Sequence, residues 1–467
     1  MEIYRREKYL TKIRPFYNDV SMIKVIVGVR RCGKSCIMQT IATELIEQGV
    51  SEKNVVYLDL DSKNFRNLKT SDELEKVIDE KAILAEEMTQ AQKVAQTQSA
   101  MQAENTTRKK DIKYLFIDEI QNIKDFEPLI NAYRNEGDWS IFITGSNAYL
   151  LSGELATKLT GRYLEFEIFT LDFKEYLDMK QMFGACTDNK ASTNISSTTG
   201  ANINFNIETN NNLRFGGNLN TNIDNEFATY IQLGGFPGAI FYETFDQKRR
   251  YIKSIVEEIF AKDIKFRMKI KHVSVFNTVR DYLINNFGAA ACITNLLNFF
   301  NNQMKIPIKR ETLNRYIQIL VDAKILYRCQ RFDMKSRKSL QREEKYYLSD
   351  LGFYFALNTD NRINFGPELE NITYLYARSR DYAVSVGRIG KLECDFVLRK
   401  NANEYAYVQV SRTIADEKTE EREYAPLEKI PDNYPKHVLR MDRLLQKRNG
   451  ITHENIVDFM LGEFEFY

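Results

Sequence analysis

Eight consecutive residues have the types and spacing of a phosphate-binding loop: Gly28, Val29, Arg30, Arg31, Cys32, Gly33, Lys34 and Ser35. They fit the pattern GxxxxGK[ST], in which the glycines let successive backbone N–H groups turn towards phosphate oxygens. In such a loop the lysine reaches the β- and γ-phosphates of a nucleotide, and the serine hydroxyl is a magnesium ligand. We therefore predict a nucleotide cradle at 28–35, with Lys34 on phosphate and Ser35 on Mg2+. Arg30 and Arg31 are additional candidates for phosphate contact.

A pair of carboxylates follows an apolar run at Tyr114-Leu-Phe-Ile117. A buried parallel strand delivers side chains at its carboxyl end, where ligands bind in open α/β sheets. Asp118 would hold magnesium through water, and Glu119 would orient or deprotonate the attacking water. Alone, two acids after a strand are weak evidence, but beside the cradle they favour hydrolysis of the nucleotide over its storage.

Two further segments carry candidates for the same reaction. Ser146 and Asn147 follow the apolar run Ile141-Phe-Ile-Thr144, where a polar side chain could contact the γ-phosphate or the attacking water. The alternative is an ordinary turn between a strand and a helix. Arg162 lies in a predicted turn and could stabilise transition-state charge, in its own chain or in a neighbouring subunit. The alternative for Arg162 is a solvated surface arginine.

The cradle and the acids require a parallel sheet to position them. After the loop, Ile37, Ile41 and Leu45 recur at helical spacing, which predicts an amphipathic helix. Apolar runs alternate with helical patterns from about 20 to 180, so the fold class predicted there is α/β with a P-loop NTPase sheet. The predicted strands lie at 24–27, 55–58, 114–117 and 141–144.

The rest of the chain divides into three blocks after a nucleotide-binding core at 1–180. Residues 184–226 are rich in Asn and Thr with few large apolar side chains, which predicts a flexible insertion. Residues 227–355 read as helices followed by a two-stranded ribbon with a charged loop at 335–345, the order of a winged helix. Residues 365–467 begin with a helix and continue with strands at 393–398 and 405–410. Inside the first block, the polar stretch 84–110 is predicted to be a solvated helical insertion.

The block at 227–355 also contains basic side chains that could contact duplex DNA. The predicted recognition helix carries Arg310 and Arg315, and the ribbon tip carries Lys335, Arg337 and Lys338. These residue types suit phosphate contacts from a wing and polar contacts from a helix in a groove. The alternative is a solvated, charged face, so DNA and a protein partner both remain open.

The composition of the chain bears on its partners, its location and its metal content. The 467 residues are 43% hydrophobic and 28% charged, and 66 basic against 64 acidic residues leave a formal net charge of +2. Global charge therefore indicates neither a nucleic-acid nor a membrane partner. No apolar run has the length of a membrane span, and the six cysteines form no CxxC pair. We expect a cytoplasmic protein with reduced thiols and without zinc; a homo-oligomer is left open.

Several motifs together resemble the AAA-type P-loop ATPases of bacteria and archaea that carry an uncharacterised C-terminal domain. They are GVRRCGKS at 28–35, DEIQ at 118–121, the run from Ile143 to Tyr176, LGGFPG at 233–238, LVDAKIL at 320–326 and KYYLSD at 345–350. The resemblance covers most of the chain except 84–110 and the Asn/Thr-rich block. It implies ATP binding and hydrolysis, a winged-helix middle, and a C-terminal α/β domain similar to the PD-(D/E)XK nuclease fold.

The nuclease pattern is incomplete in this chain. Glu370 and Asp395 lie on a predicted helix and strand of the right kind, but the third element reads Gln409-Val410-Ser411, without the acid and the lysine. Glu393 shares a strand face with Asp395 and could replace one carboxylate. Carboxylates bind the metal and the lysine helps to activate water, so we predict a degenerate domain, with nuclease activity as the alternative.

The combined prediction is a switch protein in which ATP hydrolysis with Mg2+ repositions the winged-helix and C-terminal parts. One rival is an ATPase acting on duplex DNA, and another captures a protein partner. A small-molecule kinase fits less well, because two adjacent acids suit water as the nucleophile and no substrate-binding lid is evident.

Overall fold

The computed structural model describes residues 2–96, 112–145, 159–188, 217–265, 270, 272–336, 338–358, 362–400, 404–413, 417–443 and 448–467. The chain forms two compact units, each assembled from three separate stretches of sequence. Unit 1 comprises residues 1–170, 257–280 and 306–327, and unit 2 comprises residues 171–256, 281–305 and 328–467.

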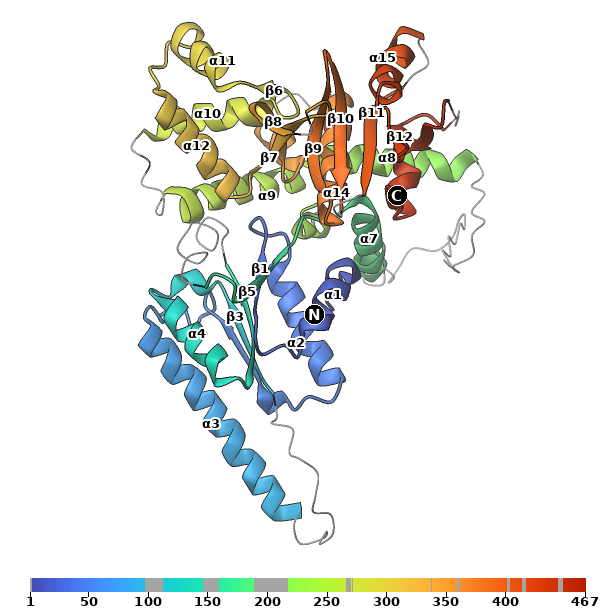
Figure 1. Cartoon of the computed structure of the whole chain (residues 1–467). Helices are drawn as coiled ribbons and strands as arrows, with labels where there is room; N and C mark the ends of the chain where they lie inside the picture. The colour runs from blue at the N-terminus through green and yellow to red at the C-terminus, as the bar shows by residue number, and fades with distance from the viewer. Residues whose placement is uncertain are drawn as a thin grey trace. The chain divides into compact units, whose positions relative to one another are not determined.

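A five-stranded parallel sheet forms the centre of unit 1 (Figure 1). Its order is β2-β3-β4-β1-β5, so β4 lies between β1 and β3. The strands are β1 (Ile23–Val27), β2 (Val55–Asp59), β3 (Lys113–Asp118), β4 (Trp139–Thr144) and β5 (Tyr163–Glu167). The four predicted strands are confirmed. Sequence reasoning missed β5, because at this edge of the sheet its YLEFE sequence is only partly buried and forms no apolar run.

Helices accompany the sheet of unit 1. Ile37, Ile41 and Leu45 of α2 are buried, as the helical spacing predicted. Helix α3 reaches Gln96, so the first part of the polar stretch 84–110 is helical, and residues 97–111 lie outside the described residues. The helices are α1 (Glu7–Ile13), η1 (Arg14–Phe16), α2 (Lys34–Glu47), η2 (Glu52–Asn54), α3 (Ser71–Gln96), η3 (Ile120–Asn122), α4 (Phe126–Glu136), the π-helix η5 (Ile259–Lys265) and α12 (Arg310–Asp322).

One lysine is enclosed in the core of unit 1. Lys24, on β1, is fully buried, and its ammonium group donates to Asp19 O at 2.5 Å, Met22 O at 3.1 Å and Ser140 Oγ at 2.8 Å. Burial lowers the pKa of Lys24 to about 7, although the Asp19 carboxylate acts in the opposite direction. A lysine in the unfolded chain titrates near 10.4, so the folded and unfolded states bind different numbers of protons.

This difference predicts a pH dependence of stability. Between about pH 7 and pH 10 the unfolded chain binds the Lys24 proton more tightly, so the free energy of unfolding should rise with pH, by at most about 1.4 kcal/mol per unit. The Lys24→Met variant should lack this contribution, whereas the exposed Lys69→Met should keep it. Denaturant unfolding of all three proteins at pH 6, 7, 8 and 9 checks the prediction. Parallel curves for wild type and Lys24→Met would mean that the three acceptors keep the lysine protonated.

Unit 2 contains an eight-stranded mixed sheet of order β13-β12-β11-β10-β9-β7-β8-β6. Strands β9, β10 and β11 pair antiparallel, and β11, β12 and β13 pair parallel. The strands are β6 (Ala290–Ala291), β7 (Leu326–Asp333), β8 (Lys338–Leu348), β9 (Ala383–Ile389), β10 (Leu392–Arg399), β11 (Tyr405–Ser411), β12 (Lys436–Arg440) and β13 (Thr452–Asn455).

The predicted charged loop at 335–345 is wrong in most of its length. Strand β8 begins at Lys338, so only a short turn separates it from β7. The two neighbours of β8 in the sheet supply pairing partners for its backbone. This pairing outweighs the low β-propensity of a run rich in Lys, Arg and Glu.

The helix and strands predicted within 365–467 are present in unit 2. Helix α14 contains the predicted helix at 367–375, and β10 and β11 contain the predicted strands. The helices are α7 (Phe173–Asp188), α8 (Gly217–Leu233), η4 (Pro237–Phe241), α9 (Phe245–Glu258), α10 (Val273–Asn285), α11 (Ile293–Asn298), the π-helix η6 (Phe299–Gln303), α13 (Gly352–Leu357), α14 (Gly366–Ser379), α15 (Glu417–Glu428) and α16 (Ile456–Leu461). Helices α9 and α10 and the first two residues of β7 cross the boundary between the units.

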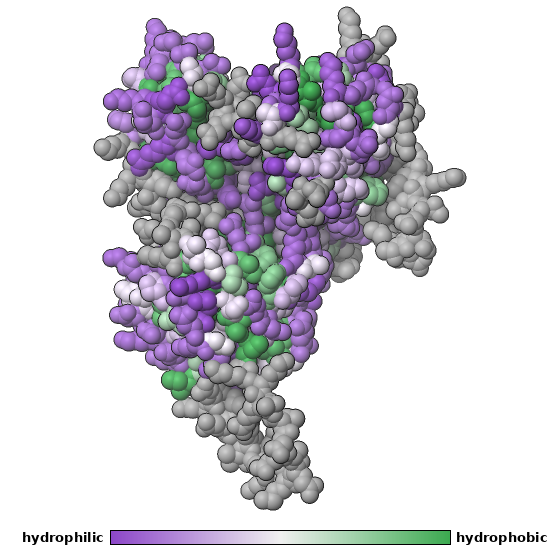
Figure 2. All heavy atoms as spheres, in the orientation of Figure 1, coloured by the Kyte–Doolittle hydropathy of each residue, from purple (hydrophilic) through white to green (hydrophobic). Residues whose placement is uncertain are grey.

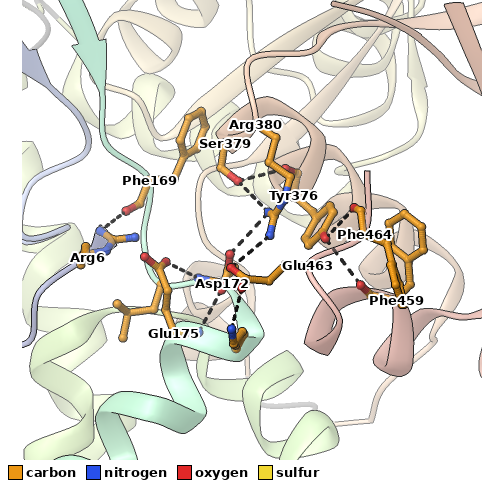
Figure 3. A network of polar contacts seen from close by, with 12 residues as sticks. Arg6, Phe169, Asp172, Glu175, Tyr376, Ser379, Arg380, Phe459, Glu463 and Phe464 are labelled. Atoms are coloured by element: carbon orange, nitrogen blue, oxygen red, sulfur yellow. Dashed lines mark hydrogen bonds and ion pairs between the residues drawn. The ribbon is translucent and has the colours of Figure 1, made fainter. Parts of the chain in front are cut away.

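An ion-pair network joins α7 to the end of the chain within unit 2 (Figure 3). The Arg380 guanidinium lies 3.5 Å from the Asp172 carboxylate, 4.0 Å from that of Glu463, and 3.5 Å from the centre of the Tyr376 ring. Lys174 pairs with Glu463 at 2.5 Å. Because Arg380 is only 7% exposed, this network fixes the C-terminal segment by charge as well as by packing.

The predicted insertion at 184–226 has helical ends. Helix α7 continues to Asp188 and α8 begins at Gly217, while 189–216 lie outside the described residues. Within the described part of the chain, no helix is long and apolar enough to cross a membrane. The cysteines whose side chains the structure describes are free thiols: Cys32, Cys36, Cys292, Cys329 and Cys394.

Candidate functional site

The loop between β1 and α2 has the backbone shape of a phosphate cradle. Gly33 has φ of 105° and Gly28 has φ of 155°. A Cβ atom at Gly28 would lie 2.2 Å from Ile168 O and 2.7 Å from Cys32 Sγ, so only glycine fits there. Helix α2 begins directly after Gly33, and its first N–H groups and its dipole favour an anion at this point.

Two buried cations hold this loop. Lys34 is 6% exposed, and its ammonium group donates to Gly28 O at 3.1 Å and Val29 O at 3.3 Å, inside the curl of the loop. Arg6 is 4% exposed and donates to Cys32 O at 3.1 Å. The same guanidinium donates to Phe169 O at 2.8 Å (Figure 3). Sequence reasoning missed Arg6, because nothing near it in sequence connects it to a loop 26 residues later.

Asp118 meets the loop at the carboxyl end of the sheet. It is 4% exposed and accepts hydrogen bonds from the hydroxyl groups of Ser35 and Thr144. Burial raises the pKa of Asp118, although both hydroxyl groups lower it. The set of oxygen atoms from Ser35 and Asp118 suits a hard cation such as Mg2+, so these residues could hold the magnesium ion as predicted.

Glu119 follows in a left-handed backbone conformation, with φ of 59°. Its N–H donates to Thr144 Oγ1 at 3.1 Å, and Gln121 Nε2 donates to its carboxylate. Thr144 therefore touches both acids from the end of β4, the strand between β1 and β3. The sequence prediction placed the polar residue of this strand two or three positions later, at Ser146 or Asn147, which lie outside the described residues.

Arg162 is not brought to this site. It directly precedes β5, its carbonyl accepts from Ile23 N at 3.0 Å, and its guanidinium donates to Asn131 Oδ1 at 3.2 Å. Ile23 begins β1, whereas the cradle follows the end of that strand at Val27. The five residues of β1 separate the two ends of the strand by about 16 Å. Arg162 therefore lies at the amino end of the strands, and the cradle lies at their carboxyl end.

Arg30 and Arg31 contact carboxylates from the later part of unit 1. Arg30 Nε and Nη2 lie 3.1 and 3.2 Å from the two Asp263 oxygens, and its Nη1 lies 3.5 Å from Glu258 Oε1. Arg31 lies 3.2 Å from Glu258 Oε2. Burial lowers the pKa of Arg30, but the carboxylates of Asp263, Glu119 and Glu258 together raise it above its ordinary value. Neither acid was a candidate in the sequence, since more than 200 residues separate them from the loop.

Unit 2 contains a second polar site, a cavity of about 580 Å3. Glu370 of α14, Glu393 and Asp395 of β10, and Gln409 of β11 line it, as does Lys345 of β8. Lys345 is 5% exposed, and its ammonium group lies 3.0 Å from Glu370 Oε2 and 2.9 Å from Glu393 Oε1. The nuclease-like pattern lacked a lysine on its third element, and the structure brings one to these acids from a different strand.

Asp395 and Gln409 are hydrogen-bonded to other groups of the cavity lining. Asp395 Oδ2 accepts from Val410 N at 2.9 Å, and Gln409 donates to Glu423 Oε2 at 2.7 Å. Burial raises the pKa of Asp395 well above its usual range, and the Glu370 carboxylate adds to the effect. Among the described residues, no group of three or more His, Cys, Asp and Glu side chains is arranged to hold a metal ion.

The candidate DNA-binding cations lie on two different elements. Arg310 and Arg315 are exposed on α12, and on the face seen in Figure 2 the region of α12 is covered mostly by hydrophilic side chains. Lys335 and Lys338 are exposed at the turn between β7 and β8, and Arg337 lies outside the described residues. The cations of α12 belong to unit 1 and those of the turn belong to unit 2.

The chain is similar to two proteins over much of its length. It is 29% identical over 457 residues to an uncharacterized protein of Haemophilus influenzae, with 98% of each chain covered. It is 27% identical over 385 residues to the uncharacterized protein MJ1544 of Methanocaldococcus jannaschii, covering 82% of this chain and 72% of the other. Among solved structures, the Walker-type ATPase PABY2304 of Pyrococcus abyssi has a TM-score of 0.46 and 14% identity, covering 76% of this chain and 96% of the other.

Two family models match parts of the chain. Residues 224–363 match a domain of unknown function (DUF8612). Residues 20–177 match an AAA domain, a stretch that contains the cradle, Asp118, Glu119 and Thr144. The parallel sheet of unit 1 and this match together support a nucleotide-binding domain similar to AAA-type ATPases.

Proposed function

We propose that the protein hydrolyses ATP with Mg2+ at the carboxyl end of the unit 1 sheet. One observation carries the proposal. Ser35, which follows Lys34 in the loop, and Thr144 of β4 both donate hydroxyl hydrogen bonds to Asp118, so the loop and the acid meet at one point. Lys34 would bind the β- and γ-phosphates. Ser35 and Asp118 would hold Mg2+, which neutralises charge on the phosphate oxygens.

Glu119 would act on the attacking water. As the water oxygen bonds to the γ-phosphorus, the bond between that phosphorus and the bridging oxygen of ADP breaks, and a water proton passes to Glu119. Gln121 and Thr144 support this role by fixing the carboxylate and the backbone of Glu119.

Hydrolysis would drive a conformational switch that reaches beyond unit 1. The proposal includes a winged helix within 227–355, a C-terminal domain of degenerate nuclease-like fold, and a cytoplasmic location, which the free thiols favour. The partner of the switch is either duplex DNA or another protein. Exposed Arg310 and Arg315 on α12 favour DNA.

Replacing Lys34 tests the nucleotide site. Lys34→Ala should weaken Mg-ATP binding by about 10- to 100-fold, because a charge-assisted hydrogen bond contributes about 1.5–3 kcal/mol. Lys124→Ala, an exposed lysine of unit 1, is the matched control. Calorimetric titration with a slowly hydrolysed ATP analogue measures both. Equal affinity in wild type and Lys34→Ala would refute the site.

The partner is tested by turnover with and without duplex DNA. Stimulation that falls steeply between 50 and 200 mM salt would select DNA, because phosphate contacts release counterions. This stimulation should weaken in Arg310→Ala and Arg315→Ala. Turnover that does not respond to DNA would favour a protein partner instead.

The cavity of unit 2 is proposed to bind a ligand or to stabilise the fold rather than to cut phosphodiesters. The internal pairing of Lys345 with Glu370 and Glu393 supports this view, since it neutralises the carboxylates without a metal. Nuclease activity remains the alternative, because Lys345 could supply the lysine that Ser411 replaces.

A further inference from the structure

The proposed ATPase site needs a positive charge near the γ-phosphate besides Lys34. In phosphoryl transfer an arginine often supplies it, because negative charge on the phosphoryl oxygens is stabilised in the transition state. Arg162 lies at the opposite edge of the sheet in its own chain. Arg30 lies inside the cradle itself, and its charge interacts with that of Glu119.

The guanidinium of Arg30 is held in a fixed orientation. Its side chain is 11% exposed, and Asp263, which is 4% exposed, binds its Nε–Nη2 edge through both carboxylate oxygens. Such a two-bond contact fixes the plane of the guanidinium as well as its position. Glu258 adds a weaker contact to Nη1 at 3.5 Å.

The element that carries Asp263 is itself unusual. Asp263 lies in the π-helix η5, which continues directly from α9. π-Helical turns are rare and occur frequently at functional sites. Here the wider turn accompanies the placement of two acids, Glu258 and Asp263, against consecutive arginines of the loop. An isolated surface ion pair would require neither the burial nor the two-bond geometry.

We propose that Arg30 is a catalytic arginine acting on the γ-phosphate in its own chain, and that Asp263 is the residue that positions it. This inference rests on the proposed ATPase function and names a further part of that site. Asp263 keeps the guanidinium beside the loop by its Nε–Nη2 edge. Nη1 is held only weakly, at 3.5 Å from Glu258, and would turn from that carboxylate to phosphate. In this arrangement Arg30 contributes mainly to turnover, whereas Lys34 contributes mainly to nucleotide binding.

The test is a double-mutant cycle in the full-length chain. Arg30→Ala should lower kcat by about 100-fold or more, and Asp263→Asn by about 10-fold, each with less than about a threefold change in the KM for ATP. In the Arg30→Ala background, Asp263→Asn should have no further effect on kcat, because its action passes through Arg30. Asp263→Glu should recover part of the lost turnover. Glu257→Gln, an exposed acid beside Glu258, is the control.

The outcomes separate this proposal from the proposed function. If Asp263→Asn lowers kcat equally in wild-type and Arg30→Ala backgrounds, its role is structural and the positioning proposal fails while the ATPase stands. If Arg30→Ala changes only the KM, Arg30 is a binding residue and the catalytic assignment fails. A wild-type protein that binds Mg-ATP without turnover would overturn both. Thermal unfolding of each variant identifies any loss of kcat that is caused by misfolding. If Asp263→Asn is misfolded, the cycle is repeated with Asp263→Glu in its place.

Discussion

Replacing Glu119 with glutamine is expected to lower magnesium-dependent ATP turnover by about 100-fold or more while ATP binding persists. Glutamine has the shape of glutamate but cannot accept the proton of the attacking water. The surroundings of residue 119 should survive the change, because the Thr144 contact is made by the backbone N–H. Phosphate release and nucleotide affinity, measured on the same preparation, give the two quantities.

A neighbouring acid provides the matched control. Asp125 is exposed, has the same left-handed backbone as Glu119, and directly precedes α4. Asp125→Asn should hydrolyse ATP at the wild-type rate, since asparagine also tolerates that backbone. If Glu119→Gln keeps more than about a tenth of wild-type turnover, Glu119 is not the general base and the chemistry proposed for this site must be revised.

Replacing Lys345 with methionine should destabilise the protein by about 3–5 kcal/mol at neutral pH. Methionine retains much of the apolar stem but removes the charge that lies between Glu370 and Glu393, beside the buried Asp395. Removing one partner of a buried ion pair leaves uncompensated charge in a poorly solvated place, and losses of about this size follow. Denaturant unfolding of wild type and Lys345→Met measures the difference, with the exposed Lys338→Met of the same strand as control.

The pH dependence of the loss identifies its cause. In wild type the Glu370, Asp395 and Glu393 carboxylates raise the pKa of Lys345 by more than burial lowers it, so Lys345 is positively charged at neutral pH. Acidification neutralises Asp395, whose pKa is raised by burial, and so weakens the repulsion among the acids of the cavity in Lys345→Met; the stability difference should therefore shrink towards pH 4. A difference that is constant from pH 4 to pH 8 would attribute the loss to packing instead of charge.

The same variants test the nuclease alternative. Wild type incubated with DNA and Mg2+ or Mn2+ should leave the DNA intact. Divalent-dependent cleavage that disappears in both Lys345→Met and Asp395→Asn would establish a nuclease whose lysine comes from β8. Asparagine keeps an oxygen that can accept from Val410 N, as Asp395 does, so the Asp395→Asn variant should fold normally.

The strands of unit 1 could be predicted because local chemistry determines them. The predicted strands are mostly apolar runs, buried along their length in β1, β3 and β4 and at alternate residues in β2. The loop after β1 has glycine where a Cβ at Gly28 would collide with Ile168. Neighbouring residues in the sequence therefore contain enough information. The strand that contains Thr144 was predicted, but the role of Thr144 was not. Spacing alone cannot tell which polar residue at the end of a strand turns towards the acids.

The missed residues share a physical reason. Arg6, Asp263 and Lys345 act on groups that are distant in sequence, and each side chain is an ordinary surface type that gains its role only when folding buries it. No periodicity or motif distinguishes Lys345 from the other lysines of its charged stretch. For the same reason Arg162 looked plausible: a turn arginine has no local feature that tells which edge of a sheet it will occupy.

The interrupted sequence of unit 1 has a consequence for synthesis. The segments 257–280 and 306–327 join residues 1–170 in one compact unit, so this unit cannot be completed until Tyr327 has left the ribosome. At about 5–20 residues per second, the nascent sheet waits on the order of 8 to 30 seconds for its last helix, with the Arg30 guanidinium still lacking Asp263 for much of that time. A newly made chain could then capture nucleotide before it acquires the acid that we propose prepares Arg30 for catalysis.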